Sequence, residues 1–246
     1  MRPLIAGNWK MNTLRSEATA LVAGLMEQRA ERDPGCDMLV CPPFVTLRPV
    51  AEVIEGSPIA LGAQDCHAEG SGAHTGDISA AMLADAGCKC VIVGHSERRA
   101  DHRESDSLVV SKAIVAHEND LTAVICVGET LAQRESEETL SIVETQVSQS
   151  VPDGATAENT VVAYEPVWAI GTGLTPTIDQ ISEVHDYMRA LLVARFPDRA
   201  EFRLLYGGSM NPGNAREILA VDNVNGGLVG GASLKVEDFW AICTSV

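Results

Sequence analysis

Short apolar stretches recur along the chain at intervals of about 20 to 40 residues. Their apolar character is continuous rather than alternating, which is typical of strands buried on both faces of a parallel sheet. The pattern therefore predicts eight parallel strands. These are Leu4–Lys10, Met38–Cys41, Ile59–Gln64, Cys90–Gly94, Ala123–Val127, Val161–Glu165, Phe202–Tyr206 and Gly227–Gly230.

Helical periodicity appears between these stretches. Apolar residues return at a spacing near 3.6 within Ile178–Leu191, and Thr175–Thr177 supplies capping and first-turn residues just before it. A second helix is expected through Thr130–Glu138, with its acidic side chains facing water.

Eight strands alternating with helices in 246 residues favour a closed α/β barrel of the (β/α)₈ type over an open doubly wound sheet. Because no linker or low-complexity tract interrupts residues 1–246, one domain is expected. Active sites of such barrels lie where strands end and βα loops begin. Catalytic and binding residues are therefore expected at the strand ends.

Composition and charge limit the function classes. No apolar run approaches the ~20 residues of a membrane span, and the N-terminus shows no signal-peptide pattern. Seven scattered cysteines form no disulfide framework, and Cys88 and Cys90 lack the further ligands of a zinc site. These features predict a cytoplasmic protein with reduced thiols. The net charge of −16 argues against nucleic acid as a partner.

One carboxylate, Glu165, ends the sixth stretch directly before the loop Pro166–Gly173. A Glu in this position can act as a general base while the following loop closes over the substrate and expels water. An ordinary βα turn preceded by a structural Glu is the alternative interpretation.

The first stretch ends in Asn8, Trp9 and Lys10. Strand geometry turns Asn8 and Lys10 to one side and Trp9 to the other. A polar pair is thus expected at the barrel mouth. The alternative is a lysine held there by a structural carboxylate.

The fourth stretch ends before His95, and Ser96 and Glu97 are expected to open a short helix. Free amides and the positive dipole end of that helix disfavour an imidazolium ion. They predict a neutral His95 that donates from one nitrogen.

Paired glycines follow the last two stretches, in Tyr206–Ser209 and Val229–Ser233. Glycines let the backbone approach a ligand, and the loops after strands seven and eight are the common phosphate position in such barrels. Tight turns alone are the alternative explanation of each pair. Two pairs together with Gly171 favour an anion cradle.

Taken together, these motifs resemble the triosephosphate isomerase family over essentially the whole chain. They occur in the family's order, as Ala6–Lys10, Gly94–Arg99, Cys126–Glu129, Ala163–Gly173, Tyr206–Ser209 and Gly230–Leu234.

The resemblance implies reversible conversion of dihydroxyacetone phosphate and D-glyceraldehyde 3-phosphate through an enediolate, in glycolysis and gluconeogenesis, with no cofactor and no metal. Glu165 would remove a proton beside the carbonyl, and a neutral His95 would polarise the carbonyl and move protons between the oxygens. Both are the family's established roles rather than deductions from this sequence. Lys10 would place positive charge beside the developing oxyanion, and Asn8 would help to orient it.

Further roles follow only from the resemblance. Glu97 would be a partner of Lys10, and Cys126 would pack behind His95 and Glu165. The substrate's phosphate would be held by the amides of Gly171, Ser209, Gly230 and Gly231. The family is a homodimer, in which the loop matching Gln64–Asp77, with Thr75 and Gly76 at its tip, reaches the neighbouring subunit.

Several positions depart from the family's usual residues. Asp65 stands where Asn is common, His74 replaces an aromatic residue, and Asp77 replaces Glu. His102 and Arg103 occupy the place of a usual Phe-Gly. Asn223 and Asn225 occur where at least one Asp is common, so an ion pair with Arg189 is not assumed.

Two other functions share part of this pattern. Another phosphate-binding barrel, such as a sugar-phosphate epimerase or an indole-ring synthase, would share the glycine cradles. Such enzymes need metal ligands or a different acid/base set, and no inward His/Asp cluster is evident. A catalytically silent barrel would need none of the trio Lys10, His95 and Glu165.

Overall fold

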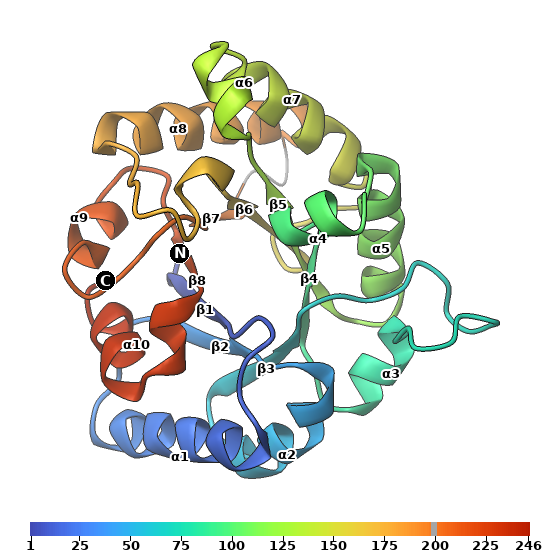
Figure 1. Cartoon of the computed structure of the whole chain (residues 1–246), viewed down its shortest axis with the longest axis vertical. Coiled ribbons are helices and arrows are strands. Elements are labelled where there is room, and N and C mark those ends of the chain that lie inside the picture. The colour runs from blue at the N-terminus through green and yellow to red at the C-terminus, as the bar shows by residue number, and fades with distance from the viewer. Residues whose placement is uncertain (198–200) are drawn as a thin grey trace.

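Eight parallel strands form a closed barrel in the part of the chain that this computed structural model describes, residues 1–197 and 201–246. Each strand pairs with the next along the chain, and the last pairs back with the first (Figure 1). The predicted (β/α)₈ barrel is confirmed. The strands are β1 (Leu4–Asn8), β2 (Asp37–Cys41), β3 (Ile59–Ala63), β4 (Cys90–Val93), β5 (Thr122–Val127), β6 (Thr160–Tyr164), β7 (Arg203–Tyr206) and β8 (Gly226–Val229).

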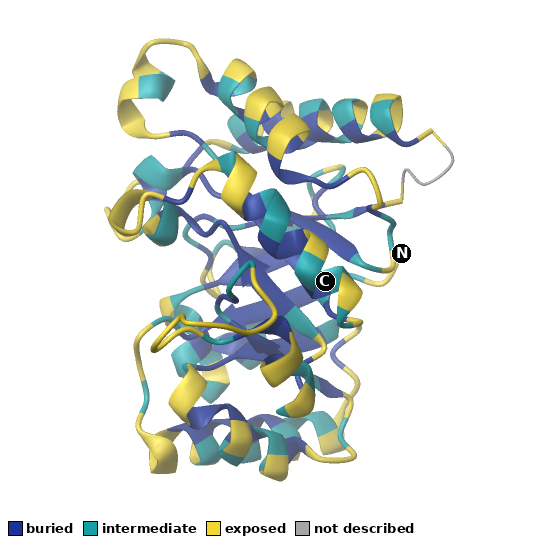
Figure 2. Cartoon of the chain, turned by 90° about the vertical axis from the view of Figure 1, so that its right-hand side faces the viewer, coloured by how far each residue is buried: buried dark blue, intermediate teal, exposed yellow. Residues whose placement is uncertain are grey.

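Helices surround the barrel and turn their buried sides toward it (Figure 2). The α-helices are α1 (Arg15–Glu31), α2 (Phe44–Ile54), α3 (Ala80–Asp85), α4 (Ser96–Asp101), α5 (Asp106–Glu118), α6 (Leu131–Glu135), α7 (Thr139–Ser150), α8 (Ile178–Arg195), α9 (Ala215–Leu219) and α10 (Val236–Cys243). Two 3₁₀ turns lie at the strand ends, η1 (Val167–Ala169) and η2 (Gly231–Leu234). Within the described residues, none of these helices combines the length and the apolarity needed to cross a membrane.

The strands are buried on both faces, as their continuous apolar character predicts. Alternate residues of each strand belong to two different apolar clusters. On β1, Leu4 and Ala6 belong to the smaller cluster, which strand residues fill, while Ile5 packs with helix residues in the larger one. Burying each large aliphatic side chain stabilises the fold by about 1.5–3 kcal/mol, so both layers hold the barrel closed.

Helix starts follow the sequence more closely than helix lengths do. Thr177 caps α8 in a capping box with Gln180, as the predicted start of that helix requires. Thr130 likewise caps α6. The single helix expected through Thr130–Glu138 is wrong, however, because α6 ends at Glu135 and Glu137 has a left-handed φ of 59°. A residue in that conformation cannot continue a right-handed helix, so the chain turns before α7 begins.

Candidate active site

A cavity of about 210 Å³ lies at the carboxyl ends of the strands. It brings together every residue that the sequence assigned to catalysis or to phosphate binding; Glu97 and Cys126 lie outside its lining. The lining residues are Asn8, Trp9, Lys10, Asn12, His95, Glu165, Ile170, Gly171, Gly207, Gly208, Ser209, Met210, Leu228, Gly230 and Gly231.

Glu165 directly follows β6 and is almost completely buried, with 1% of its surface exposed. The backbone N–H of Ser96 donates to its Oε2 at 2.8 Å, and the Ser96 hydroxyl donates to Oε1 at 3.3 Å. His95 Nε2 lies 2.8 Å from Oε1. Both carboxylate oxygens are therefore occupied. The two hydrogen bonds from Ser96 were not predicted, because the sequence indicates Ser96 only as the start of a helix.

His95 is the residue that caps α4. Its Nδ1 accepts the backbone N–H of Glu97 at 3.2 Å. A neutral imidazole has one donor and one acceptor nitrogen, so this contact places the ring proton on Nε2, the atom that faces Glu165. The short helix predicted after β4 is confirmed, and it fixes which nitrogen of His95 donates.

The pKa shifts of this pair follow from burial and mutual contact. Burial raises the pKa of Glu165, but the adjacent His95 and the Ser96 N–H lower it by more, so the net pKa lies below the ordinary value. Burial lowers the pKa of His95, but the facing carboxylate raises it above the ordinary value. The contact with Glu165 is therefore what raises the pKa of His95 in this structure. A neutral ring in the presence of substrate stays a prediction.

Lys10 is held in a strained position at the end of β1. Its φ of 52° is unusual for a residue other than glycine and costs on the order of 1–3 kcal/mol. Its N–H donates to Asn8 Oδ1 at 3.0 Å, and Gln64 Nε2 donates to its carbonyl at 2.8 Å. Its Nζ lies 2.6 Å from Glu97 Oε1. Lys10 is thus paired with a carboxylate and also lines the cavity.

Trp9 and Cys126 support the site from behind. Trp9 is fully buried in the larger apolar cluster and also lines the cavity beside Asn8 and Lys10. Cys126 is also fully buried, and burial with the nearby Glu165 charge raises the pKa of its thiol well above the ordinary value. A thiol that stays protonated is a poor nucleophile, so the surroundings of Cys126 suit packing beside Glu165.

The loop after β6 is fixed at its start and open at its tip. Trp168 Nε1 donates to Glu129 Oε1 at 2.8 Å, and the Tyr164 hydroxyl donates to the same oxygen at 3.2 Å. The segment Gly171–Leu174 is exposed. The Ser209 hydroxyl joins the loop after β7 to η1 by donating to the Ala169 carbonyl at 2.9 Å. Glu129 therefore anchors the start of the expected lid. The motif Cys126–Glu129 contains this residue, but the sequence alone does not indicate the contact.

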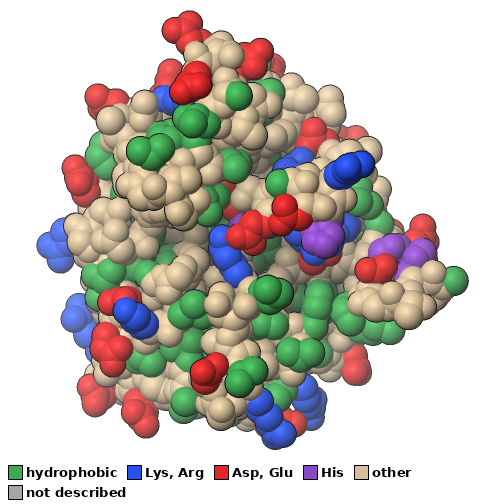
Figure 3. All heavy atoms as spheres, viewed as in Figure 1, with side chains coloured by type: hydrophobic (Ala, Val, Ile, Leu, Met, Phe, Trp, Pro, Cys, Tyr) green, Lys and Arg blue, Asp and Glu red, His purple; other side chains and the backbone are tan. Residues whose placement is uncertain are grey.

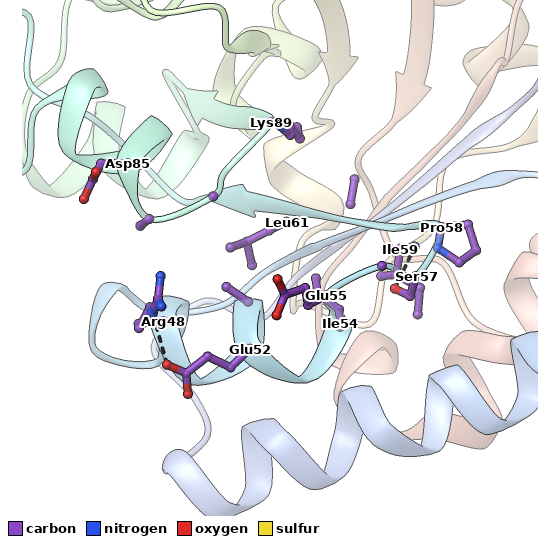
Figure 4. A pocket seen from close by; sticks show the side chains of 15 residues that line it. Arg48, Glu52, Ile54, Glu55, Ser57, Pro58, Ile59, Leu61, Asp85 and Lys89 are labelled. Atoms are coloured by element: carbon purple, nitrogen blue, oxygen red, sulfur yellow. Dashed lines mark hydrogen bonds and ion pairs between the residues drawn. The ribbon is translucent and has the colours of Figure 1, made fainter.

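A second hollow, of about 510 Å³, lies between α2 and α3 (Figure 4). The Arg48–Glu52 ion pair, 3.0 Å long, lies on its wall, and Asp85 and Lys89 are further lining residues. It adjoins the beginning of β3 rather than the carboxyl ends of the strands. Its charges do not converge on a common point, so it offers no reaction centre.

Among the described residues, one group, His67, His74 and Asp77, has ligand atoms within 4.8 Å of one another, as a metal site requires. It lies on the protruding loop and outside the cavity lining. His67 Nδ1 accepts the N–H of Glu69 at 2.9 Å, which places the ring proton on Nε2, 3.8 Å from Asp77. Binding a metal through Nε2 would have to reverse this arrangement, so the group fits a metal poorly.

Two departures from the family pattern have clear partners. Asp65 forms ion pairs with Lys112 at 2.7 Å and with Arg98 at 2.8 Å. Glu104 contacts the same two cations, at 2.6 Å each. We call Asp65, Arg98, Glu104 and Lys112 the Lys112 cluster.

The other departure concerns Arg189, which hydrogen-bonds the side chains of Asn223 at 3.1 Å and Asn225 at 2.8 Å. The two amides thus contact the guanidinium through their side-chain oxygens.

Comparisons with known proteins agree with this geometry. The model of the family described as triosephosphate isomerase matches residues 3–246. The triosephosphate isomerase of Bradyrhizobium diazoefficiens is 55% identical over 98% of this chain and 96% of its own length, and that of Ruegeria pomeroyi is 57% identical over 100% and 97%. The crystal structure of triosephosphate isomerase from Bartonella henselae superposes with a TM-score of 0.93 at 44% identity, covering 100% of this chain and 99% of its own.

Proposed function

The chain belongs to the triosephosphate isomerase family, and from this premise we propose which of its residues interconvert dihydroxyacetone phosphate and D-glyceraldehyde 3-phosphate, and how. The proposal rests on one observation. Glu165, His95 and Lys10 line a single cavity together with Gly171, Ser209 and the glycines after β8. A carboxylate, an imidazole and an ammonium thus face one small ligand whose phosphate the backbone amides can hold.

Glu165 is the base in this proposal. Its carboxylate takes a proton from the carbon beside the carbonyl, which leaves an enediolate, and returns the proton to the neighbouring carbon. To do so it must leave Ser96, which engages it in the resting site. Leaving Ser96 and His95 removes the contacts that lower its pKa, while burial continues to raise it. The base therefore gains proton affinity as it moves onto the substrate.

His95 and Lys10 stabilise the charge that develops on oxygen. The Nε2 proton of His95 is released from Glu165 in the same movement and is free to be donated to the carbonyl oxygen and to move between the two oxygens. Lys10 Nζ supplies positive charge beside them, and Asn8 orients them. Glu97 holds Lys10 in place at 2.6 Å.

The phosphate lies against the glycine side of the cavity, held by the amides of Gly171, Ser209, Gly230 and Gly231. Backbone N–H groups turn the positive ends of their dipoles toward the phosphate at close range, which offsets the unfavourable field of a protein whose net charge is −16. Closure of Pro166–Gly173 then excludes water and disfavours loss of phosphate from the enediolate.

A coupled assay tests this function. Purified protein is mixed with dihydroxyacetone phosphate and an indicator enzyme that depends on D-glyceraldehyde 3-phosphate. We expect signal in proportion to protein concentration without an added metal or cofactor, and unchanged rates after treatment with a chelator. No conversion, or conversion that requires an added metal, would reject the proposed chemistry.

We further propose that residues 1–246 form one barrel domain that works in the cytoplasm as a homodimer. Free thiols at all seven cysteines fit a reducing compartment. The loop Gln64–Asp77 projects away from the barrel (Figure 1). Met11 lines a hollow together with Gln64 and Asp65 of this loop. Met11, Leu14 and Val45 are 95%, 73% and 85% exposed, and Figure 3 shows apolar side chains between the centre of this face and the loop.

An apolar surface of this kind marks an interface more often than free surface. Light scattering tests the assembly, with an expected mass of twice the 26.1 kDa of the chain. Replacing Val45 with Glu should shift the mass toward the monomer, and a monomeric unmodified protein would contradict the proposal.

A further inference from the structure

The outer edge of β5 loses its strand partner beside the active site. Pairing between β4 and β5 ends at Val93 and Ile125, because the chain then turns into α4. On the other side β6 continues, with the Glu165 N–H donating to Val127 O at 2.7 Å and the Val167 N–H donating to Glu129 O at 3.1 Å. Gly128, between these two acceptors, therefore has a neighbour on the β6 side only.

The side chain of Gln146 takes the place of the missing strand. The Gly128 N–H donates to Gln146 Oε1 at 2.6 Å, and Gln146 Nε2 donates back to Gly128 O at 3.1 Å. One amide thus pairs with both polar groups of one backbone residue, as a neighbouring strand would. Gln146 comes from α7 and is half-buried, and it does not line the substrate cavity.

Gly128 in turn lies directly against the main chain of the base. A Cβ atom built on Gly128 would overlap the carbonyl oxygen of Glu165, so the two backbones are packed without room for a side chain. The Glu165–Pro166 peptide joins the base to the lid. A shift of Gly128 must therefore move the point from which both the carboxylate and the lid extend.

We propose that Gln146 is a positioning residue for the isomerase reaction, which fixes Gly128 and through it the backbone of Glu165. This inference rests on the proposed role of Glu165 as the base. Proton transfer to carbon depends steeply on geometry, and a displacement of 1 Å can cost on the order of 10²-fold in rate. Gln146 acts without touching the substrate, so its loss changes the reaction step more than it changes phosphate binding.

The test replaces Gln146 with Met, which has a similar size but cannot make either hydrogen bond. The matched control is Gln149→Met, at an exposed position of the same helix. Active sites are counted by titration with 2-phosphoglycolate, a carboxylate analogue of the enediolate, so that unfolded protein does not lower the measured kcat. We expect kcat per site to fall about tenfold or more in Gln146→Met with KM within about twofold, and no change in Gln149→Met.

A second readout separates positioning from stability. Misplacement of the base should weaken the binding of 2-phosphoglycolate more than that of glycerol 3-phosphate. The latter carries the phosphate but lacks the enediolate-like group. Gln146→Glu keeps the acceptor for the Gly128 N–H but sets a carboxylate oxygen against the Gly128 carbonyl oxygen, so it should also displace Gly128 and lower kcat per site, and it serves if Gln146→Met does not fold.

A merely structural Gln146 gives a different result. The melting temperature then falls while kcat per titrated site stays within twofold of the unmodified protein, and this outcome overturns the inference. Failure of the proposed function is recognised separately, because the unmodified protein would then give no conversion in the coupled assay, and failure of the base assignment is recognised because Glu165→Gln would then retain turnover whatever Gln146→Met does.

Discussion

Two buried carboxylates, Glu165 and Glu104, both contact residues of α4 but are held in different ways. They are 1% and 6% exposed, and α4 supplies Ser96 to the first and Arg98 to the second. Burial raises the pKa of each, and hydrogen-bonded partners bring each below its ordinary value. Glu104 is held by Lys112 and Arg98 at 2.6 Å each. Glu165 is held by an N–H, a hydroxyl and a histidine.

This difference distinguishes a structural carboxylate from one that can move and act as a base. Lys and Arg keep their charge when Glu104 moves, so leaving would strand buried charges, and removing one partner of such a pair costs about 3–5 kcal/mol. Ser96 carries no charge, and His95 is predicted to be neutral when Glu165 leaves it, so releasing Glu165 costs hydrogen bonds to a carboxylate, about 1.5–3 kcal/mol each, and leaves no permanently charged partner behind. Low exposure alone does not distinguish the two roles, whereas the charge of the partners does.

The largest expected effect comes from Glu165→Gln. Loss of the base should lower kcat by about 10²–10⁴-fold while the fold is preserved, as measured by the coupled assay and circular dichroism. The control is Glu104→Gln, which should lower stability instead and leave kcat per folded site near normal. Near-normal turnover in Glu165→Gln would remove the base assignment.

Lys112→Met should have the next largest effect, on stability rather than on rate. It leaves the carboxylates of Asp65 and Glu104 short of one buried cation, and we expect the free energy of unfolding to fall by about 3 kcal/mol or more. Urea titration measures this change. A decrease in the free energy of unfolding below about 1 kcal/mol would show that the charged partners of the Lys112 cluster do not hold Glu104 in place as proposed.

Lys10→Met should lower kcat by on the order of 10²-fold, because it removes the cation beside the developing oxyanion, and should also weaken the binding of glycerol 3-phosphate. Lys89→Met is the control, since Lys89 is exposed and lies in the hollow between α2 and α3. Unchanged kinetics in Lys10→Met would exclude Lys10 from the site.

Asp65→Asn should have the smallest effect and a characteristic pH dependence. Burial raises the pKa of Asp65 despite Lys112 and Arg98, so the folded state binds its proton more tightly than the unfolded state does. This contribution to stability is present below the unfolded pKa and is lost as the pH rises through the folded pKa. The stability of the unmodified protein relative to Asp65→Asn should therefore fall as pH rises above about 4, and Asp65→Asn should be as stable or slightly more stable at pH 7. Urea titrations across pH measure this, and the opposite slope would contradict the assignment.

Features set by local sequence could be predicted. Continuous apolar runs gave the strands to within two residues, and Asn8, Lys10, His95 and Glu165 were found because strand ends in a barrel meet at one rim. Of their partners, Glu97 beside Lys10 was named through the family resemblance, whereas Ser96 and Gln146 were not found. Ser96 reaches Glu165 across 69 residues and Gln146 reaches Gly128 across 18, and neither spacing leaves a periodic signal. The break before α7 depends on a left-handed non-glycine residue, Glu137, which composition does not reveal.

The contrast between the two carboxylates is tested most directly by a crystal structure with 2-phosphoglycolate bound. We expect the Glu165 carboxylate to have left the Ser96 N–H, which it now accepts at 2.8 Å, and to point at the ligand, while Lys112 remains 2.6 Å from Glu104. A bound ligand with Glu165 still on Ser96, or a Lys112 cluster that rearranges together with it, would contradict the distinction.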